Sequence, residues 1–410
     1  MPKNGFSIWR AILAISILVF VVTQSAEAVE KVLVNFKGSN GSAPYGALIS
    51  DAAGNLYGTT TGGGVHSLGT VFELTPNTTG GWRSKILHSF NADGIDGIVP
   101  YTRLVFDSAG NLYGTTNNGG SNNVGTVFEL TPNTSGTWKE TILYSFQNNG
   151  TDGNYPYGSL ILDSSGTLYG TTAGGGTSFA GTVYELTPHG SGKWVETVLL
   201  NFDYTNGYST YAGLIFDAYG NLYGAAYAGG AYGYGTVFEL TPQGSGQWNA
   251  TVLYNFNGQN STGDAPYGTL IFDSAGNLYG TTLFGGTYDS GMVFELTPQT
   301  SGEWTEIVVH SFEPSNWDSG NPFAGLVMDA AGNLYGTANQ GGRFNYGTVF
   351  KLTPNADGGW TEQRLHDFNN NSRDGYAPYC TVLLDNAGNL YGVTYQGGTQ
   401  NSGTVFEIVP

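Results

Sequence analysis

The chain has 410 residues, of which 13 are Lys or Arg and 31 are Asp or Glu, so its formal net charge is −18. Charged residues make up only 11% of the chain, whereas 14% are aromatic. A sparsely charged, aromatic-rich composition argues against intrinsic disorder. The strong acidity argues against a nucleic-acid partner, because such binding depends on Lys and Arg neutralising phosphates. The single Cys excludes a disulfide framework and a cysteine zinc site.

The N-terminus has the order of a secretory signal. Lys3 and Arg10 precede an apolar run at 11–22, and Ala26-Glu27-Ala28 forms a small-x-small cleavage pattern. Residues 1–28 are therefore predicted to be a signal peptide. The run is too short for a typical membrane span, although an uncleaved signal anchor is the alternative. We expect the protein to be exported to the periplasm, cell surface or extracellular space, with no stable membrane span after cleavage.

One sequence unit recurs along the rest of the chain. Gly-Asn-Leu-Tyr-Gly or a close variant surrounds seven tyrosines, which are Tyr57, Tyr113, Tyr169, Tyr223, Tyr279, Tyr335 and Tyr391. Their spacings are 56, 56, 54, 56, 56 and 56 residues. Self-similarity at a fixed period is the signature of a repeat architecture.

Each unit contains four short stretches that favour strands. In the second unit they cover 101–107, 111–116, 125–131 and 138–146, and they are rich in Val, Ile, Phe, Tyr and Thr between polar turns. Four antiparallel strands per repeat of this length are typical of a propeller blade. Helix-length amphipathic segments are absent from the sequence, so the fold class is predicted to be all-β.

The chain ends predict how the ring closes. A fourth-strand segment appears at 29–36, before the first complete unit, and the chain stops after a seventh third-strand segment at 403–409. Pairing of these two segments would complete the last blade and remove two open sheet edges. Residues 29–410 are therefore predicted to form one seven-bladed β-propeller, closed by an N-terminal outer strand, and we expect a monomer.

The units resemble a known repeat family. Their Gly-Asn-Leu-Tyr-Gly-Thr-Thr, Gly-Thr-Val-Phe-Glu-Leu-Thr-Pro and Asp-Gly-x-x-Pro-Tyr elements look like those of the GloVer tandem-repeat (choice-of-anchor) family of exported bacterial proteins. The resemblance covers essentially the whole chain after residue 28 and implies a fold and a compartment. Family members carry varied C-terminal anchoring segments, and this sequence ends without one, so we expect release or peripheral attachment. The resemblance transfers no catalytic residue or ligand.

Residues that hardly vary between units are interpreted as structural. The second-strand Tyr and third-strand Phe fit core packing. The turn acids, such as Asp107, are expected to cap their own hairpins rather than form a ring of metal ligands. The strand-three acids, such as Glu129, are expected to be solvated or to pair across strands. Cys380 occupies a position held by small residues in the other units and is expected to be buried.

No cofactor or metal is predicted. His88, His310 and His366 share one position on the outer strands, so they cannot meet at a single ion. Calcium bound by acids in the links between units is an alternative, although acids in such turns usually cap backbone groups. These acids are Asp93, Asp96, Asp152, Asp264, Asp318 and Asp374.

The loops between the second and third strands vary most, together with the links between units, and both emerge on one face of a propeller. A rigid scaffold that displays variable loops usually places its function there. The predicted ligand-binding residues are Tyr227, Tyr232, Tyr234, Phe284, Tyr288, Arg343, Phe344, Tyr346 and Tyr395. The alternative is that these rings pack their own loops. Arg103, which has no basic counterpart in the other units, is expected to reach the mouth of the channel.

These features favour an exported, non-enzymatic binding or scaffold propeller whose partner is an extracellular glycan or protein. A secreted carbohydrate-active or metal-dependent enzyme on the same fold is the main alternative. Asp264, Asp289 and Asp318 are its nearest candidate acids, because a glycosidase needs two carboxyl groups about 5–9.5 Å apart. A structural protein of the cell surface or matrix is the third possibility, since propellers host many unrelated functions.

Overall fold

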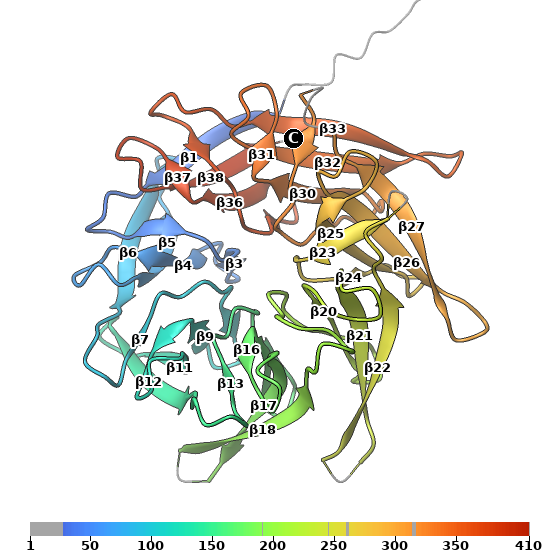
Figure 1. The fold of residues 1–410 in the computed structure, drawn as a ribbon. Coiled ribbons are helices and arrows are strands. Elements are labelled where there is room, and N and C mark those ends of the chain that lie inside the picture. Colours follow the sequence, from blue (N-terminus) through green and yellow to red (C-terminus); the bar gives the residue numbers. More distant parts are fainter. Residues whose placement is uncertain (1–27, 191, 245, 260–261, 314–316, 410) are drawn as a thin grey trace, which may run out of the picture.

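Seven four-stranded antiparallel sheets are arranged as blades around a central axis (Figure 1). This computed structural model describes residues 28–190, 192–244, 246–259, 262–313 and 317–409. The fold is the all-β, seven-bladed propeller that the repeats predict. The predicted signal peptide lies outside the described residues, apart from Ala28. Within the described ranges there is no helix long and apolar enough to cross a membrane.

Two strands of each blade lie nearest the axis. The innermost strands are β3 (Ile49–Ser50), β8 (Val105–Phe106), β14 (Ile161–Leu162), β19 (Ile215–Phe216), β24 (Ile271–Phe272), β29 (Val327–Met328) and β35 (Leu383–Leu384). The second strands are β4 (Leu56–Gly62), β9 (Leu112–Thr116), β15 (Leu168–Thr172), β20 (Leu222–Ala226), β25 (Leu278–Gly285), β30 (Leu334–Ala338) and β36 (Leu390–Thr394). The innermost strands are shorter than predicted, because the residues before them turn towards the axis.

The other two strands of each blade are longer. The third strands are β5 (Thr70–Pro76), β11 (Thr126–Pro132), β17 (Thr182–His189), β21 (Thr236–Pro242), β26 (Met292–Pro298), β32 (Thr348–Pro354) and β38 (Thr404–Val409). The outer strands are β6 (Trp82–Ser89), β12 (Trp138–Ser145), β18 (Lys193–Asn201), β22 (Trp248–Asn255), β27 (Trp304–Ser311), β33 (Trp360–Asp367) and β1 (Val29–Asn35). The last two strand predictions for the second unit are confirmed to within one residue at each end.

Short strands join the inter-blade link to the neighbouring loop between second and third strands in six blades, and an isolated bridge between Tyr208 and Ala228 does so in the fourth. They are β2 (Ser42–Pro44), β7 (Gly97–Ile98), β10 (Asn118–Gly119), β13 (Gly153–Asn154), β16 (Gly174–Gly175), β23 (Gly263–Pro266), β28 (Ser319–Gly320), β31 (Gln340–Gly341), β34 (Gly375–Tyr376) and β37 (Gln396–Gly397). We call the face that they occupy the loop face. The opposite face carries the tight turns and is called the turn face.

The ring closes as the chain ends predict. β1 pairs antiparallel with β38, with Val32 opposite Phe406. In Figure 1 the blue β1 lies beside the red β38, so the first and last parts of the chain share one blade. The outer edge of β38 is therefore paired, whereas an unpaired edge can recruit other chains.

The hydrophobic core lies between blades. The Phe that follows each outer strand packs edge-on against the third-strand aromatic of the next blade, as Phe90 does on Phe128 with ring centroids 5.3 Å apart. Both rings are fully buried. The second-strand Gly makes room for this aromatic, because a Cβ on Gly114 would lie 2.6 Å from Cζ of Phe128. The Leu-Tyr-Gly signature therefore reflects core packing.

The turn-face hairpins confirm the predicted capping. Asp107 Oδ1 accepts the backbone N–H groups of Ala109 and Asn111, and Oδ2 accepts the Asn111 amide at 2.8 Å and the Tyr113 hydroxyl at 3.1 Å. Burial opposes ionisation of this carboxyl, but these hydrogen bonds outweigh it and lower the pKa of Asp107. Tyr113 also donates to its cross-strand partner Glu129 at 2.9 Å. The repeated acids of this face are thus engaged in holding hairpins together.

Candidate functional site

A closed ring of aromatic side chains surrounds the axis at the loop-face end of the channel. It comprises Tyr45, Tyr101, Tyr157, Tyr211, Tyr267, Phe323 and Tyr379, one from the start of each blade. Every neighbouring pair has ring centroids between 4.8 and 5.2 Å apart. We call these seven residues the axial ring. They come from the Pro-Tyr element of the repeat, in which Thr210 and Phe323 are the departures.

The axial ring is also connected across its centre. The hydroxyls of Tyr45 and Tyr267, which belong to non-adjacent blades, lie 3.3 Å apart. Burial, followed by the proximity of Tyr267, raises the pKa of Tyr45 well above its usual range. Both phenols therefore stay protonated at neutral pH, and together they constrict this end of the channel.

Two of the predicted binding residues join the axial ring. Tyr227 packs edge-on against Tyr211 at 5.3 Å and Tyr267 at 6.2 Å. Tyr395 packs similarly against Tyr379 at 5.7 Å and Tyr45 at 6.3 Å. Both follow a second strand, so they extend the ring outwards onto the loop face in the fourth and seventh blades.

The other predicted binding residues lie further out on the loop face. Tyr232, Tyr234, Phe284, Tyr288, Phe344 and Tyr346 have between 37% and 62% of their surface exposed. The Arg343 guanidinium lies 5.5 Å from the centroid of Phe344, and Tyr346 packs against Tyr376 of the next link at 5.1 Å. Among the described residues, no ring–ring contact connects these six aromatics to the axial ring. They form separate exposed positions rather than one cluster.

A hollow of about 480 Å³ opens on the loop face beside the axial ring, in the third blade. Tyr157 and Tyr211 of the ring line it, together with Phe179 and Tyr155, which are 67% and 39% exposed. Asn117 also lines the hollow; its side-chain nitrogen is buried and has no hydrogen-bond partner within the described structure. The hollow thus combines exposed rings with the buried amide of Asn117 beneath them.

The sequence comparison decides the family. The pattern of the Gloeobacter/Verrucomicrobia repeat matches residues 18–227, 136–329 and 306–410. The chain belongs to this family. The resemblance drawn from the Gly-Asn-Leu-Tyr-Gly and Pro-Tyr elements is therefore confirmed, and the axial ring is built from one element of the Gloeobacter/Verrucomicrobia repeat. No curated protein sequence is significantly similar to the chain.

Solved structures share the fold at low identity. A virginiamycin B lyase from Staphylococcus aureus is 14% identical with a TM-score of 0.54, over 93% of this chain and 99% of that one. The extracellular domain of a putative one-component system from B. thetaiotaomicron is also 14% identical, with a TM-score of 0.51 over 90% of this chain and 39% of that one. At this identity the likeness concerns the fold alone.

Three junctions between repeats contain a His, an Asp and a Glu. The groups are His88–Asp96–Glu140, His310–Asp318–Glu362 and His366–Asp374–Glu30, and in each the candidate ligand atoms lie within 4.8 Å of one another. In the first, His88 Nε2 lies 3.1 Å from Asp96 Oδ2 and 3.4 Å from Glu140 Oε1. The three His residues do not meet at one ion, as predicted. That each His lies near two acids was not apparent from the sequence, because the Glu comes from the following blade.

These groups have donor atoms that suit a divalent ion such as zinc, but a different junction explains them without one. Between the second and third blades, Tyr144 donates to Asp152 Oδ2 at 2.8 Å. Burial, followed by the charge of Asp152, raises the pKa of Glu196 to about 8 there. An Asp and a Glu, Asp152 and Glu196, are therefore present at this junction too, although Tyr144 replaces the His. We interpret the junctions as carboxyl pairs that share a proton between blades.

The acids in the inter-blade links mostly accept hydrogen bonds from backbone groups, as expected. Asp96 Oδ2 accepts the backbone N–H of Asn91 at 2.9 Å, and Asp374 Oδ2 accepts that of Asn369 at 3.0 Å.

Cys380 is buried, and Arg103 lines the central channel. The axial ring and the hollow were missed from the sequence, although seven Pro-Tyr-type elements at the same place in each unit were a usable signal.

Proposed function

We propose that this propeller is an exported binding or scaffold protein that recognises an extracellular glycan through its loop face, centred on the hollow beside the axial ring. The N-terminal sequence supports export. The description of one structural neighbour as an extracellular domain is consistent with that location. A protein partner is the alternative, and it would be favoured if the glycan array described below gave no hits.

The distribution of exposed apolar side chains carries the proposal. Those on the loop face are Val65, Ile95, Tyr155, Phe179, Tyr204, Tyr232, Tyr234, Phe284, Tyr288, Trp317, Phe344 and Tyr346. Fewer lie elsewhere: Val195, Ile307 and Val308 are on outer strands, and Val409 and Tyr219 are towards the turn face. Exposed apolar groups gathered on one face mark binding surfaces. Aromatic rings next to uncharged amides suit the apolar faces and hydroxyls of neutral sugars.

The hollow offers the sharpest test. Phe179→Ala and Tyr155→Ala remove exposed rings from it, and Asn117→Ala removes the unpartnered amide. The matched control is Tyr219→Ala, because Tyr219 is 88% exposed on the turn face. A glycan array on the chain from Val29 identifies the ligand, and calorimetry then gives the affinities. We expect each hollow variant to bind at least about tenfold more weakly, equivalent to about 1.4 kcal/mol, and the control to bind normally. An array without hits, or hollow variants that bind as well as the control, would refute the glycan proposal.

Glycoside cleavage is the second candidate function, and one pair of acids favours it. Burial, followed by the charge of Asp289, raises the pKa of Asp264. A raised carboxyl pKa beside a second carboxylate is the direction that a general acid requires. The third acid expected from the sequence, Asp318, is instead held by His310 at 3.2 Å. Release of reducing ends from an array hit, abolished by Asp264→Asn, would establish this activity; intact glycan after incubation would rule it out.

A further inference from the structure

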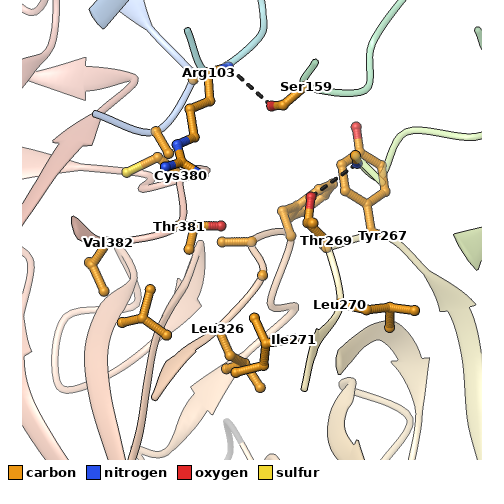
Figure 2. Close-up of a pocket in the computed structure, with 18 of the residues that line it drawn as sticks. Arg103, Ser159, Tyr267, Thr269, Leu270, Ile271, Leu326, Cys380, Thr381 and Val382 are labelled. Carbon is orange, nitrogen blue, oxygen red and sulfur yellow. Dashed lines mark hydrogen bonds between the residues drawn. The ribbon is translucent and has the colours of Figure 1, made fainter. Parts of the chain in front are cut away.

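The central channel below the axial ring is a second, separate cavity of about 590 Å³ (Figure 2). Its wall is built from the residues that lead into the innermost strands. In the third blade, for example, Tyr157, Ser159 and Ile161, each two residues further along, all border the cavity. The wall therefore has tiers: the axial ring, a tier two residues further along each chain segment, and a third tier another two residues on.

The second tier contains the one charged side chain of the described channel lining. Arg103 occupies it in the second blade, where the other blades have Ala47, Ser159, Gly213, Thr269, Gly325 and Thr381. Figure 2 shows the Arg103 side chain directed into the cavity that these residues border. Since the neighbouring positions are small, the guanidinium has free space beside it.

Arg103 has no opposite charge there. No Asp or Glu is among the described residues that line the channel, and none of the ion pairs of the described structure includes Arg103. Its backbone N–H donates to Ser159 Oγ at 3.2 Å. The guanidinium has no acidic partner among the described residues. The channel wall desolvates the guanidinium in part and lowers its pKa, yet arginine remains charged at neutral pH. The Arg103 side chain as a whole is exposed, so a ligand inside the channel can reach its charge.

The third tier is apolar. Ile161, Ile215, Ile271, Val327 and Leu383 line it, and no charged residue of the described lining interrupts it towards the turn face. Tyr45 and Tyr267 constrict the opposite end. The cavity thus has a cation near its narrow end and a hydrocarbon wall towards the end from which a ligand could enter.

We propose that this channel binds a small amphiphilic carboxylate, with its carboxylate on Arg103 and its hydrocarbon tail along the third tier. The guanidinium matches a carboxylate with two parallel hydrogen bonds, and Thr269 and Thr381 place hydroxyls on the same tier. The volume lies within the usual range of small-molecule sites. This site does not depend on the loop-face function, because the axial ring separates the two.

Calorimetry with octanoate on the chain from Val29 tests the proposal. Octylamine has the same tail but a positive charge at neutral pH, and acetate has the carboxylate without the tail. We expect octanoate to bind at least about tenfold more tightly than either. Arg103→Ala should weaken octanoate binding at least about tenfold, and Arg103→Lys less, because an ammonium lacks the paired geometry. Arg343→Ala, on the loop face, is the matched control and should bind octanoate normally.

Arg103→Ala is expected to fold, because Ala47 already occupies this position in the first blade. Its melting temperature without ligand should be close to that of the unsubstituted chain, because the Arg103 side chain is exposed and takes part in no ion pair of the described structure. Four results would each overturn the proposal: no octanoate binding, equal binding of octylamine, equal binding of acetate, or undiminished binding by Arg103→Ala. Loss of glycan binding with intact octanoate binding would concern the loop face only.

Discussion

Tyr45 and Tyr267 are separated by 222 residues, and their hydroxyls meet at 3.3 Å across the propeller axis. One belongs to the first blade and the other to the fifth. The contact exists only when all the intervening blades are in place, so it reports on closure of the whole ring. It also separates the loop face, with its exposed aromatics, from the channel that holds Arg103.

The hydroxyl contact of the axial ring should contribute to stability. Tyr45→Phe leaves the Tyr267 hydroxyl without this partner, and we expect a loss of about 1 kcal/mol in the free energy of unfolding. Tyr267→Phe should cost a similar amount. The double substitution should cost less than the sum of the two, because it leaves neither group unpaired. Denaturant unfolding of the four proteins measures the coupling, and strictly additive losses would contradict a direct bond.

A methyl group on the second strand should disrupt the core. In Gly114→Ala, the new Cβ would lie 2.6 Å from Phe128 Cζ and 2.8 Å from Leu104 Cδ2. Overpacking of this kind typically costs about 1–3 kcal/mol. Gly62→Ala is the matched control, because its nearest neighbour atoms are 3.8 Å away. The free energy of unfolding should fall for Gly114→Ala only. Adding Phe128→Leu to Gly114→Ala should recover part of the loss.

Stability should decrease as the pH rises from about 5 to 9. Burial, followed by the charge of Asp96, raises the pKa of Glu140 to about 9, and burial followed by Asp318 raises that of Glu362 to about 8. A raised carboxyl pKa means that the folded state holds protons that the unfolded state has released. The resulting stability is complete below the unfolded pKa of about 4.3 and is lost as the pH passes the folded value.

Glu140→Gln should reduce this pH dependence by on the order of 1 kcal/mol, while keeping the melting temperature at pH 6 nearly unchanged. Glu129→Gln, on a third strand, is the control. Melting curves between pH 5 and 9 provide the measurement, in buffer with EDTA and again with Zn²⁺. A large stabilisation by Zn²⁺ that disappears in Glu140→Gln would show that the junction holds a metal ion rather than a proton.

The N-terminal strand should be required for a monomer. A chain that lacks Val29–Asn35 would leave the outer edge of β38 unpaired and remove Leu33 and Val34 from the core cluster that contains Val405. Open apolar edges recruit other chains. Light scattering should therefore show oligomers or aggregates for this chain and a monomer for the chain that begins at Val29. A monomeric, equally stable shortened chain would contradict closure by β1.

The sequence alone determined the blades, because seven copies within one chain can be compared with each other. Hairpin capping by Asp107, burial of Phe128 and the pairing of β1 with the last blade involve residues within one unit or at the two chain ends, and the repeat exposes them directly. Expectations about the loop face were less complete. Tyr227 and Tyr395 pack against the axial ring, whereas the other predicted aromatics are separate from it.

Only the tertiary structure decided what the units build together. Convergence of seven Pro-Tyr-type elements on one axis, the meeting of His88 with Glu140 of the next blade, and the isolation of Arg103 all depend on how blades are rotated against one another. That rotation comes from the packing of pairs such as Phe90 and Phe128 at every junction. A periodic sequence specifies which residues are equivalent, but distances between equivalent residues arise only when the ring has closed.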